Sequence, residues 1–300
     1  MTNILRTRSE LFALTAAALN GTIGPFNRFG FMDGASHHEI AFLKCFIAFL
    51  ILLSFCTANV DRRRQVFSLK SKAPHFFVLA FLGIFCLYFF ETWAFKEASI
   101  PLVSFLTYAA GGITIVLSAI FLGERIGMFR LIAFALIICG VFLIYSFEAG
   151  VSGSPLGILL ALLGGLGYAL FIFTSKLFRM GSGLAHLVWL FGFGSLYLLV
   201  PVLIDGFSVP SMTTMAVILG LVLLPTIGGF YFTTKAVQTG EASSVQIIET
   251  SDPLFATIFA FGLFGDQLGV AGWTGAACIM IGLLLALKKE PEAAPHATLR

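Results

Sequence analysis

Long apolar segments alternate with short polar connections along almost the whole chain. Each segment has about 20 residues, which is enough for a helix to cross a hydrocarbon core about 30 Å thick. Short alternating segments, typical of a transmembrane β-barrel, are not the pattern seen. The pattern therefore predicts an all-α polytopic membrane protein with ten transmembrane helices. The predicted spans cover residues 9–28, 38–58, 74–95, 100–121, 127–147, 155–176, 184–204, 212–235, 243–264 and 270–288.

One stretch of sequence occurs twice, in residues 98–127 and again in residues 240–269. Both copies contain Ala-Ser near their start and end in a loop with glycine and an acid. The loop glycines, Gly123 and Gly265, lie 142 positions apart in the 300-residue chain, which is about half its length. Transporters that consist of two such halves enclose a site near the middle of the membrane, between the repeats. The repetition therefore favours a transporter.

Lys and Arg residues are distributed unevenly over the connections. With the N-terminus placed in the cytoplasm, fifteen of the 18 fall inside or at inner span ends; Arg28 and Lys96 fall at outer ends, and Lys44 lies within a span. Cytoplasmic loops of membrane proteins carry such an excess of positive charge, so we expect both termini in the cytoplasm. The short, compact chain suggests a bacterial source and hence the inner membrane.

Five spans per half is an odd number, so the two halves must enter the membrane from opposite sides. We therefore predict two inverted five-helix repeats, at residues 1–150 and 151–290, and a cytoplasmic tail at residues 291–300. The first loop copy would be cytoplasmic and the second external. The second copy has Gln267 where the first has Arg125, as the charge rule favours.

Composition agrees with a membrane protein and argues against several functional classes. Charged residues make up 11% of the chain, against about 25% in soluble domains, and the mean hydropathy is +0.98. The sequence has no Walker A, HExxH or GxSxG motif, and its five cysteines lack the spacing of a disulfide framework or zinc site. We expect no enzyme activity, cofactor, metal or nucleic-acid partner. A membrane enzyme or a lipid-handling protein is the alternative from another class.

Four motifs are arranged as in a known transporter family. They are Glu39-Ile40-Ala41-Phe42-Leu43-Lys44 in the second span, Trp93-Ala94-Phe95-Lys96-Glu97-Ala98-Ser99 at the end of the third, Gly123-Glu124-Arg125 after the fourth and Asp252-Pro253-Leu254-Phe255-Ala256 in the ninth. With them the chain resembles the drug/metabolite transporter (DMT) superfamily, in its ten-span EamA-type branch, over about residues 9–288. The resemblance implies a basket of two inverted repeats, with a cavity lined by spans 1, 3, 4, 6, 8 and 9. It also implies export or import of small metabolites.

Two positions depart from the pattern of that family. The proline of its fourth span is replaced by Gly111, followed by Gly112, and the aromatic residue usual in its first span is Asn20. The resemblance implies that both positions face the central cavity. The substrate of close relatives therefore need not be the substrate of this chain.

Three acids in the predicted spans are candidates for contact with substrate or protons. A charged side chain at the centre of a membrane helix costs about 2.5–3.5 kcal/mol on insertion scales, so it usually has a partner or a task. Glu249 and Asp252 are three residues apart and share a helix face, and Pro253 frees a backbone carbonyl beside them. Glu91 lies two residues before Trp93, whose ring could attract the same cation. The alternatives are a scaffold hydrogen bond for Asp252 and an interfacial tryptophan beside a hydrated Glu91.

A lysine, an asparagine and three tyrosines complete the candidate substrate site. Lys44 could hold a substrate carboxylate or pair with an acid. Asn20 offers both a donor and an acceptor, and tyrosines in cavity-lining spans combine an apolar ring with a hydrogen-bonding tip. Ordinary hydrogen bonds between helices are the alternative for these residues. The tyrosines are Tyr108, Tyr168 and Tyr231 in spans 4, 6 and 8.

Together these features predict a secondary transporter of small polar metabolites that exports amino acids or related amines by alternating access. The substrate ammonium group would meet Glu249, Asp252 or Glu91, and a carboxylate would meet Lys44 or backbone donors. Protons are a candidate coupling ion, because a carboxylic acid in a low-dielectric cavity can exchange its proton near neutral pH. The alternative within transport is a carrier for organic cations such as quaternary amines, which acids and aromatic rings also suit.

Overall fold

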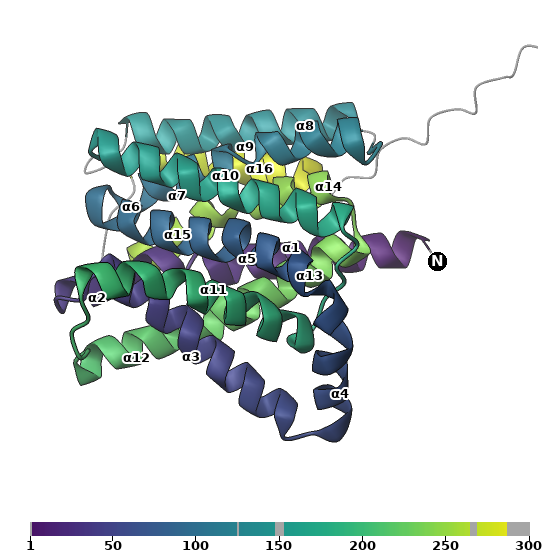
Figure 1. Ribbon diagram of the computed structural model, residues 1–300. Coiled ribbons are helices and arrows are strands. Elements are labelled where there is room, and N and C mark those ends of the chain that lie inside the picture. The colour runs from purple at the N-terminus through teal and green to yellow at the C-terminus, as the bar shows by residue number, and fades with distance from the viewer. Residues whose placement is uncertain (1, 125, 148–152, 265–268, 287–300) are drawn as a thin grey trace, which may run out of the picture.

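Helices account for most of the chain in the computed structural model, which describes residues 2–124, 126–147, 153–264 and 269–286 (Figure 1). In chain order they are α1 (Thr2–Asn20), α2 (Ile23–Met32), α3 (His37–Thr57), α4 (Val60–Ser68), the 3₁₀-helix η1 (Leu69–Lys72), α5 (Ala73–Ala80), the π-helix η2 (Phe81–Glu91), α6 (Thr92–Glu97), α7 (Ile100–Ala109), α8 (Gly112–Phe121), α9 (Met128–Phe147), α10 (Pro155–Leu177), α11 (Leu184–Asp205), α12 (Met212–Leu221), the π-helix η3 (Val222–Gly229), α13 (Phe230–Thr239), α14 (Ala242–Glu249), α15 (Asp252–Phe264) and α16 (Val270–Ala286). The expectations for Arg125, for residues 265–268 and for the tail at 291–300 lie outside the described residues.

The helices follow the predicted spans closely. Two shorter apolar helices, Met128–Gly140 and Val270–Gly282, fall within the predicted fifth and tenth spans. The predicted first span, residues 9–28, overlaps α1 and α2, which are separated at Gly21 and Thr22. The prediction of an all-α polytopic membrane protein is confirmed. Within the described residues, 7 helical stretches are long and apolar enough to cross a membrane: His37–Thr57, Val60–Glu97, Leu102–Phe121, Pro155–Leu177, Leu184–Asp205, Met212–Thr239 and Ala242–Phe264.

Polar residues start several helices, because their side chains accept the backbone N–H groups that the first turn leaves unpaired. Ser36 and Glu39 form a capping box at the start of α3, in which Ser36 N donates to Glu39 Oε2 at 3.0 Å. Asn59 caps α4, so the polar connection between the second and third spans is helical. Ser154 and Ser211 cap α10 and α12 in the same way.

The two halves of the chain interrupt their helices at corresponding places. η2 in the third span and η3 in the eighth are π-helices, and η3 contains Pro225. The fourth span breaks between α7 and α8 at Ala110 and Gly111, and the ninth breaks between α14 and α15 at Thr250 and Ser251. Such interruptions are frequent at functional sites. They mark the region between η2 and η3 as the place where a site should be sought.

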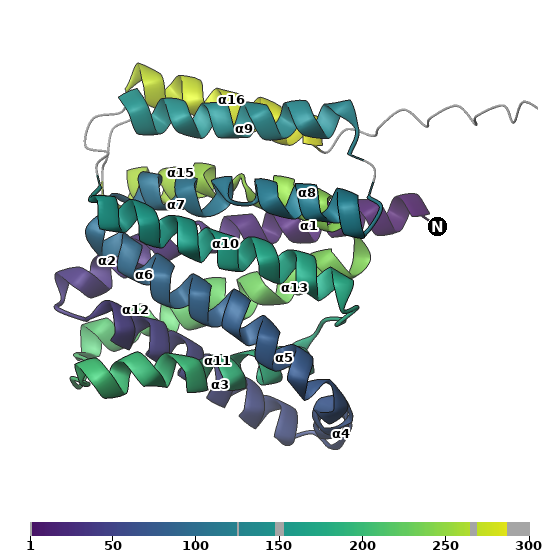
Figure 2. The ribbon, with the colours of Figure 1, turned by 45° about the horizontal axis from the view of Figure 1, so that its top comes forward.

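The main packing contacts join the first half of the chain to the second. η2 packs on α10, and η3 packs on α1. In the same way α3 packs on α11, and α7 and α8 pack on α15 and α14. α9 and α16 form a neighbouring pair at one side of the bundle (Figure 2). The halves are therefore interleaved.

The bundle has two ends, between which α3 runs from α2 to α4 (Figure 1). We call them the α2 end and the α4 end. The first residues of α1 lie at the α4 end in both views (Figure 2). These two names describe the structure without assigning a side of the membrane.

Candidate substrate site

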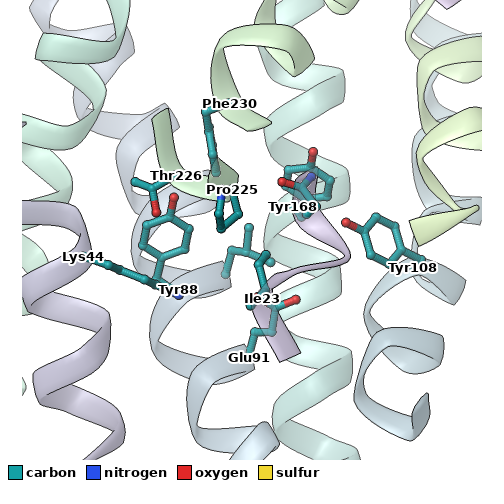
Figure 3. A pocket seen from close by; sticks show the side chains of 11 residues that line it. Ile23, Lys44, Tyr88, Glu91, Tyr108, Tyr168, Pro225, Thr226 and Phe230 are labelled. Carbon is teal, nitrogen blue, oxygen red and sulfur yellow. The ribbon is translucent and has the colours of Figure 1, made fainter. Parts of the chain in front are cut away.

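A small cavity lies at the centre of the bundle, between the two π-helices (Figure 3). Its volume is about 10 Å³. A buried cavity needs about 10–15 Å³ to hold one water molecule, so the walls have closed on each other in this conformation. Side chains from both halves line it. They include five of the residues that the sequence predicted, Asn20, Lys44, Glu91, Tyr108 and Tyr168.

Lys44 is buried and has two partners that are not acids. Its Nζ donates to Thr92 Oγ1 at 3.1 Å and lies 4.1 Å from the centre of the Tyr88 ring. Within the described part of the chain no carboxylate forms an ion pair with it; Glu39 accepts hydrogen bonds from Ser208 instead. Lys44 also interacts electrostatically with the carboxylate of Glu91, which lines the same cavity.

Glu91 is the acid of this cavity that is left open to a ligand. It stands in the last turn of η2 with 3% of its surface exposed. Its Oε2 has no hydrogen-bond partner among the residues that the structure describes. A buried polar atom without a partner costs about 1–3 kcal/mol, and more for a charged group. A bound ligand or water molecule that donates to Oε2 would remove this cost.

The two acids of the ninth span reach the cavity only through tyrosines. Glu249 accepts from Tyr168 Oη at 2.5 Å and from Thr233 Oγ1 at 2.8 Å. Asp252 accepts from Tyr108 Oη at 3.2 Å. The two tyrosine rings meet edge to face, with centroids 6.2 Å apart, and both line the cavity. Each acid is therefore one hydrogen bond away from a residue of the cavity wall.

The two departures from the family pattern have different surroundings. Asn20 lines the cavity. Its side chain lies so close to the backbone of Gly229 that a Cβ atom added to this glycine would be 2.2 Å from Asn20 Oδ1. At Gly111, a Cβ atom would lie 2.2 Å from Nε2 of Gln246 on α14. Gln246 Oε1 in turn accepts from Thr114 at 3.2 Å. The structure therefore places Asn20 at the cavity wall, whereas the side chain of Gln246 fills the space beside Gly111, which is not among the lining residues.

Two predicted site residues do not line the cavity. Trp93 stacks on His37 with ring centroids 4.7 Å apart. Tyr231 is half-buried, and the Lys235 ammonium lies 5.8 Å from the centre of its ring. Trp93 is therefore not placed where its ring could contact a substrate cation bound to Glu91.

Other residues stand at the cavity wall that sequence reasoning missed. They are Tyr88, Thr226 and Phe230, together with apolar neighbours (Figure 3). A signal existed for Tyr88, because it precedes Glu91 by three residues and an α-helix would place both on one side. Thr226 follows Pro225, and a proline in a membrane helix marks backbone that is irregular. Phe230 carries no such signal.

At the α2 end, two acids hold the connection between α11 and α12. Asp33 accepts hydrogen bonds from the Ser211 hydroxyl and from Thr214, whose N lies at 3.1 Å and Oγ1 at 2.5 Å. Glu39 accepts from Ser208 N at 2.5 Å and Oγ at 2.7 Å. The Ser211 and Thr214 hydroxyl groups lower the pKa of Asp33, because they favour its charged form. These bonds join the two halves and close the α2 end.

Replacing Asp33 with alanine is expected to loosen this closure. Without the carboxylate, Thr214 N and two hydroxyl groups lose an acceptor, so amide hydrogen exchange should accelerate several-fold at residues 208–214. Acid should act in the same direction: the contact is complete above the ordinary pKa of aspartate and is lost as the pH falls through the lowered value. Asp61→Ala, at the α4 end, should leave this exchange unchanged. Equal exchange in all three proteins would contradict the prediction.

At the α4 end, Glu124 of the Gly-Glu-Arg loop caps α14. Its carboxylate accepts from Ala242 N at 2.8 Å and from Ser243, whose N lies at 3.0 Å and Oγ at 2.6 Å. Negative charge at a helix N-terminus is stabilising, so this acid positions the ninth span. An ion pair between Arg130 and Glu241 ties α9 to the same turn.

A second cavity of about 560 Å³ lies at the α4 end, between α8, α10 and α13. We call it the vestibule. Phe171 lines the vestibule, whereas Phe230 lines the central cavity, and their ring centroids are 5.5 Å apart. Phe191 packs on Phe230 at 5.7 Å. Packed aromatic rings therefore separate the vestibule from the central cavity.

Phe230→Ala is expected to connect the two cavities. In a cysteine-free background carrying Thr226→Cys, a water-soluble thiol reagent should then react more than about tenfold faster, because access no longer depends on a rare opening. The control is Phe232→Ala, whose ring packs on Phe12 outside both cavities. An unchanged rate for the Phe230 variant, or an equal rise for the control, would show that these rings do not separate the cavities.

Comparisons with known proteins agree with this arrangement. The model of the EamA-like transporter family matches residues 7–146 and again residues 155–288. An uncharacterized transporter from Archaeoglobus fulgidus is 24% identical over 281 residues, which are 93% of this chain and 96% of that protein. A crystal structure of a protein with 18% sequence identity has the same fold, with a TM-score of 0.78 over 94% of this chain and 97% of that one. The chain therefore belongs to the EamA-like transporter family, as its motifs indicated.

Proposed function

We propose that this chain is a secondary transporter that moves small polar metabolites across the bacterial inner membrane by alternating access. Its family and its archaeal relative support a membrane transporter. A closed cavity between interleaved halves supports a central site. Hydrogen bonds hold the α2 end together, whereas the α4 end contains the vestibule. Rocking of the halves would open one end as it closes the other.

We further propose ten spans in two inverted repeats, residues 1–150 and 151–290, with both termini in the cytoplasm. The two matches to the family model fall one in each repeat. The corresponding π-helices and helix breaks support the same division. The excess of Lys and Arg at inner span ends supports this orientation, which places the α4 end and the vestibule in the cytoplasm.

The proposed substrates are amino acids or related amines, moved outward. The observation that carries this is the Oε2 atom of Glu91, which has no hydrogen-bond partner among the described residues and belongs to the same small cavity as Lys44. A zwitterion offers an ammonium group to the first and a carboxylate to the second. Lys44 contacts Thr92 and the Tyr88 ring and also interacts electrostatically with the Glu91 carboxylate. A zwitterion would place its own carboxylate and ammonium group between these two opposite charges.

Glu249 and Asp252 are the proposed sites of a coupling proton. No Lys or Arg among the described residues forms an ion pair with either acid. Each accepts a hydrogen bond from a tyrosine of the cavity wall, so a substrate that displaces Tyr108 or Tyr168 would change the surroundings of an acid. Protonation and substrate binding would thereby be linked.

A carrier for organic cations is the second candidate. The faces of Tyr88, Tyr108, Tyr168 and Phe230 favour it, because aromatic rings attract cations, and the Lys44 ammonium already rests on one of them. A choline-like quaternary amine has no carboxylate and would leave Lys44 without a role in binding.

Counterflow in proteoliposomes distinguishes these candidates. Purified protein is loaded with unlabelled compound and offered labelled neutral, basic and acidic amino acids beside a quaternary amine. Uptake of zwitterions would support the amino-acid proposal, and uptake of the quaternary amine alone would replace it with the cation carrier. Absence of all uptake, by protein whose thermal unfolding is cooperative, would contradict both. Empty liposomes and liposomes with a heat-unfolded sample are the controls.

A further inference from the structure

Helix α4 and the turn η1 carry an unusual density of positive charge. Residues 62–72 contain five of the 18 Lys and Arg residues of the chain, and the single acid of residues 60–72 is Asp61. Within the described part of the chain, none of the five forms an ion pair with a carboxylate. The cations are Arg62, Arg63, Arg64, Lys70 and Lys72.

One face of α4 is anchored to the bundle. Val66 is buried, and its carbonyl oxygen accepts from Trp189 Nε1 of α11 at 2.9 Å. The Arg62 guanidinium lies 4.1 Å from the centre of the Phe55 ring of α3. These contacts fix which side of α4 turns away from the bundle.

The opposite face combines exposed apolar and cationic side chains. Val60, Arg63, Arg64 and Phe67 follow the spacing i, i+3, i+4 and i+7, so they form one stripe. Val60 is 53% exposed and Phe67 66% exposed, and both arginines are exposed. We call these four residues the outer stripe. Helices that lie in the membrane interface combine apolar side chains, which meet the acyl chains, with Lys and Arg, which meet the headgroups.

The outer stripe lies where two membrane spans end. α4 begins just after α3 and, through η1, precedes α5; it runs across the direction of its long neighbours at the α4 end (Figure 1). Exposed apolar side chains continue onto both spans, with Phe55 on α3 and Phe77 on α5. The stripe therefore stands at the border between lipid chains and headgroups.

We propose that α4 and η1 bind the anionic headgroups of phospholipids in the adjacent leaflet. Clusters of four to eight cations beside a membrane span attract anionic lipid. Each cation near the surface raises the association constant by about fivefold. A soluble polyanion would neutralise the arginines but leave Val60 and Phe67 in water. A lipid satisfies both parts of the stripe, with its headgroup on the cations and its chains on the apolar residues.

Trp189 can serve as the fluorescence donor in a test of this proposal, because its indole contacts α4. Trp93 lies in α6, at the far end of the third span, and Trp273 lies in α16 beyond Phe264, whose ring contacts Phe29 at the α2 end. In a protein with Trp93→Phe and Trp273→Phe, energy transfer from Trp189 to dansyl-labelled lipid reports which headgroup gathers beside α4. Transfer to phosphatidylglycerol should exceed transfer to phosphatidylcholine at equal lipid fraction. Equal transfer would overturn the proposal.

The variant Arg63→Gln/Arg64→Gln/Lys70→Gln removes three cations and should lower the relative association of phosphatidylglycerol by about 100-fold. The matched control Arg63→Lys/Arg64→Lys keeps the charge and should keep the preference. Raising the salt concentration to 1 M shortens the screening length to about 3 Å and should abolish the preference for phosphatidylglycerol in the protein with the unmodified stripe. This test does not depend on whether the triple variant folds. A preference that survives salt, or that millimolar inorganic phosphate removes at constant ionic strength, would overturn the proposal; the latter outcome would identify a site for soluble anions.

Discussion

Glu91→Gln is expected to lower counterflow of zwitterionic amino acids by at least about tenfold. A hydrogen bond to a charged group contributes about 1.5–3 kcal/mol, which corresponds to roughly 10–150-fold in binding. Glutamine keeps the size of the side chain but removes the negative charge that an ammonium group would meet. The effect should be large because Oε2 has no hydrogen-bond partner among the described residues. The Lys44 ammonium attracts this carboxylate but forms no ion pair with it in this part of the chain.

Three comparisons make this test specific. Glu97→Gln removes an acid outside the cavity, where Glu97 accepts from Ser154 Oγ at 3.4 Å, and should leave counterflow unchanged. Glu249→Gln should alter the pH dependence more than the substrate preference, because that acid sits behind Tyr168. Unfolding temperatures of the variants establish that they are folded. Full activity of Glu91→Gln would contradict the ammonium site, whatever substrate the panel identifies.

Gly165→Ala is expected to destabilise the protein by about 1–3 kcal/mol, the usual cost of forcing an extra group into a packed interface. The new Cβ atom would lie 2.2 Å from the carbonyl oxygen of Thr107 on α7. Because that atom belongs to the backbone, the clash cannot be relieved by rotating a side chain. α7 and α10 would have to separate, which would also displace Tyr108 and Tyr168, so transport should fall with stability. Small residues at helix crossings in membranes serve this close approach.

Gly262→Ala is the matched control for Gly165→Ala. Gly262 also lies inside a helix, but a Cβ atom there would meet no atom within 4 Å. Alanine favours the helix over glycine by about 0.5–1 kcal/mol, so this variant should be as stable as the wild type or slightly more so. Unfolding midpoints in detergent, followed by size-exclusion chromatography after heating, measure both. A similar loss in the two variants would show that crowding at Thr107 is not the cause.

The sequence predicted the helical spans and several cavity residues from signals that are strong in membranes. Lys44 and Glu91 were identifiable because a charge within an apolar run is costly and so rarely accidental. Tyr108 and Tyr168 were identifiable because they are polar-tipped rings at mid-span. The partners of the acids were not predictable, because they depend on how α10 and α7 approach α14 and α15, which lie 81 and 144 positions further along the chain at the residues that meet.

Helix rotation explains the residues that were placed differently. Trp93 follows Glu91 by two positions, and residues so spaced point to different sides of a helix. Tyr231 comes directly after η3, where wider π-helical turns change the angular position of each later residue relative to an α-helix. Tyr231 was selected as a tyrosine of a predicted cavity-lining span, whereas the structure places its neighbour Phe230 at the cavity wall.

The interleaving of the halves also bears on how the protein is made. η2, α3, α7 and α9 each find a main packing partner in the second half of the chain. A ribosome adds about 5–20 residues per second, so the remaining 150 or so residues take roughly 8–30 s to follow. During that interval the helices of the second half, which later cover Lys44, Glu91 and the inner helix faces of the first half, are not yet present. The first half therefore reaches its final packing only after the second half has been made.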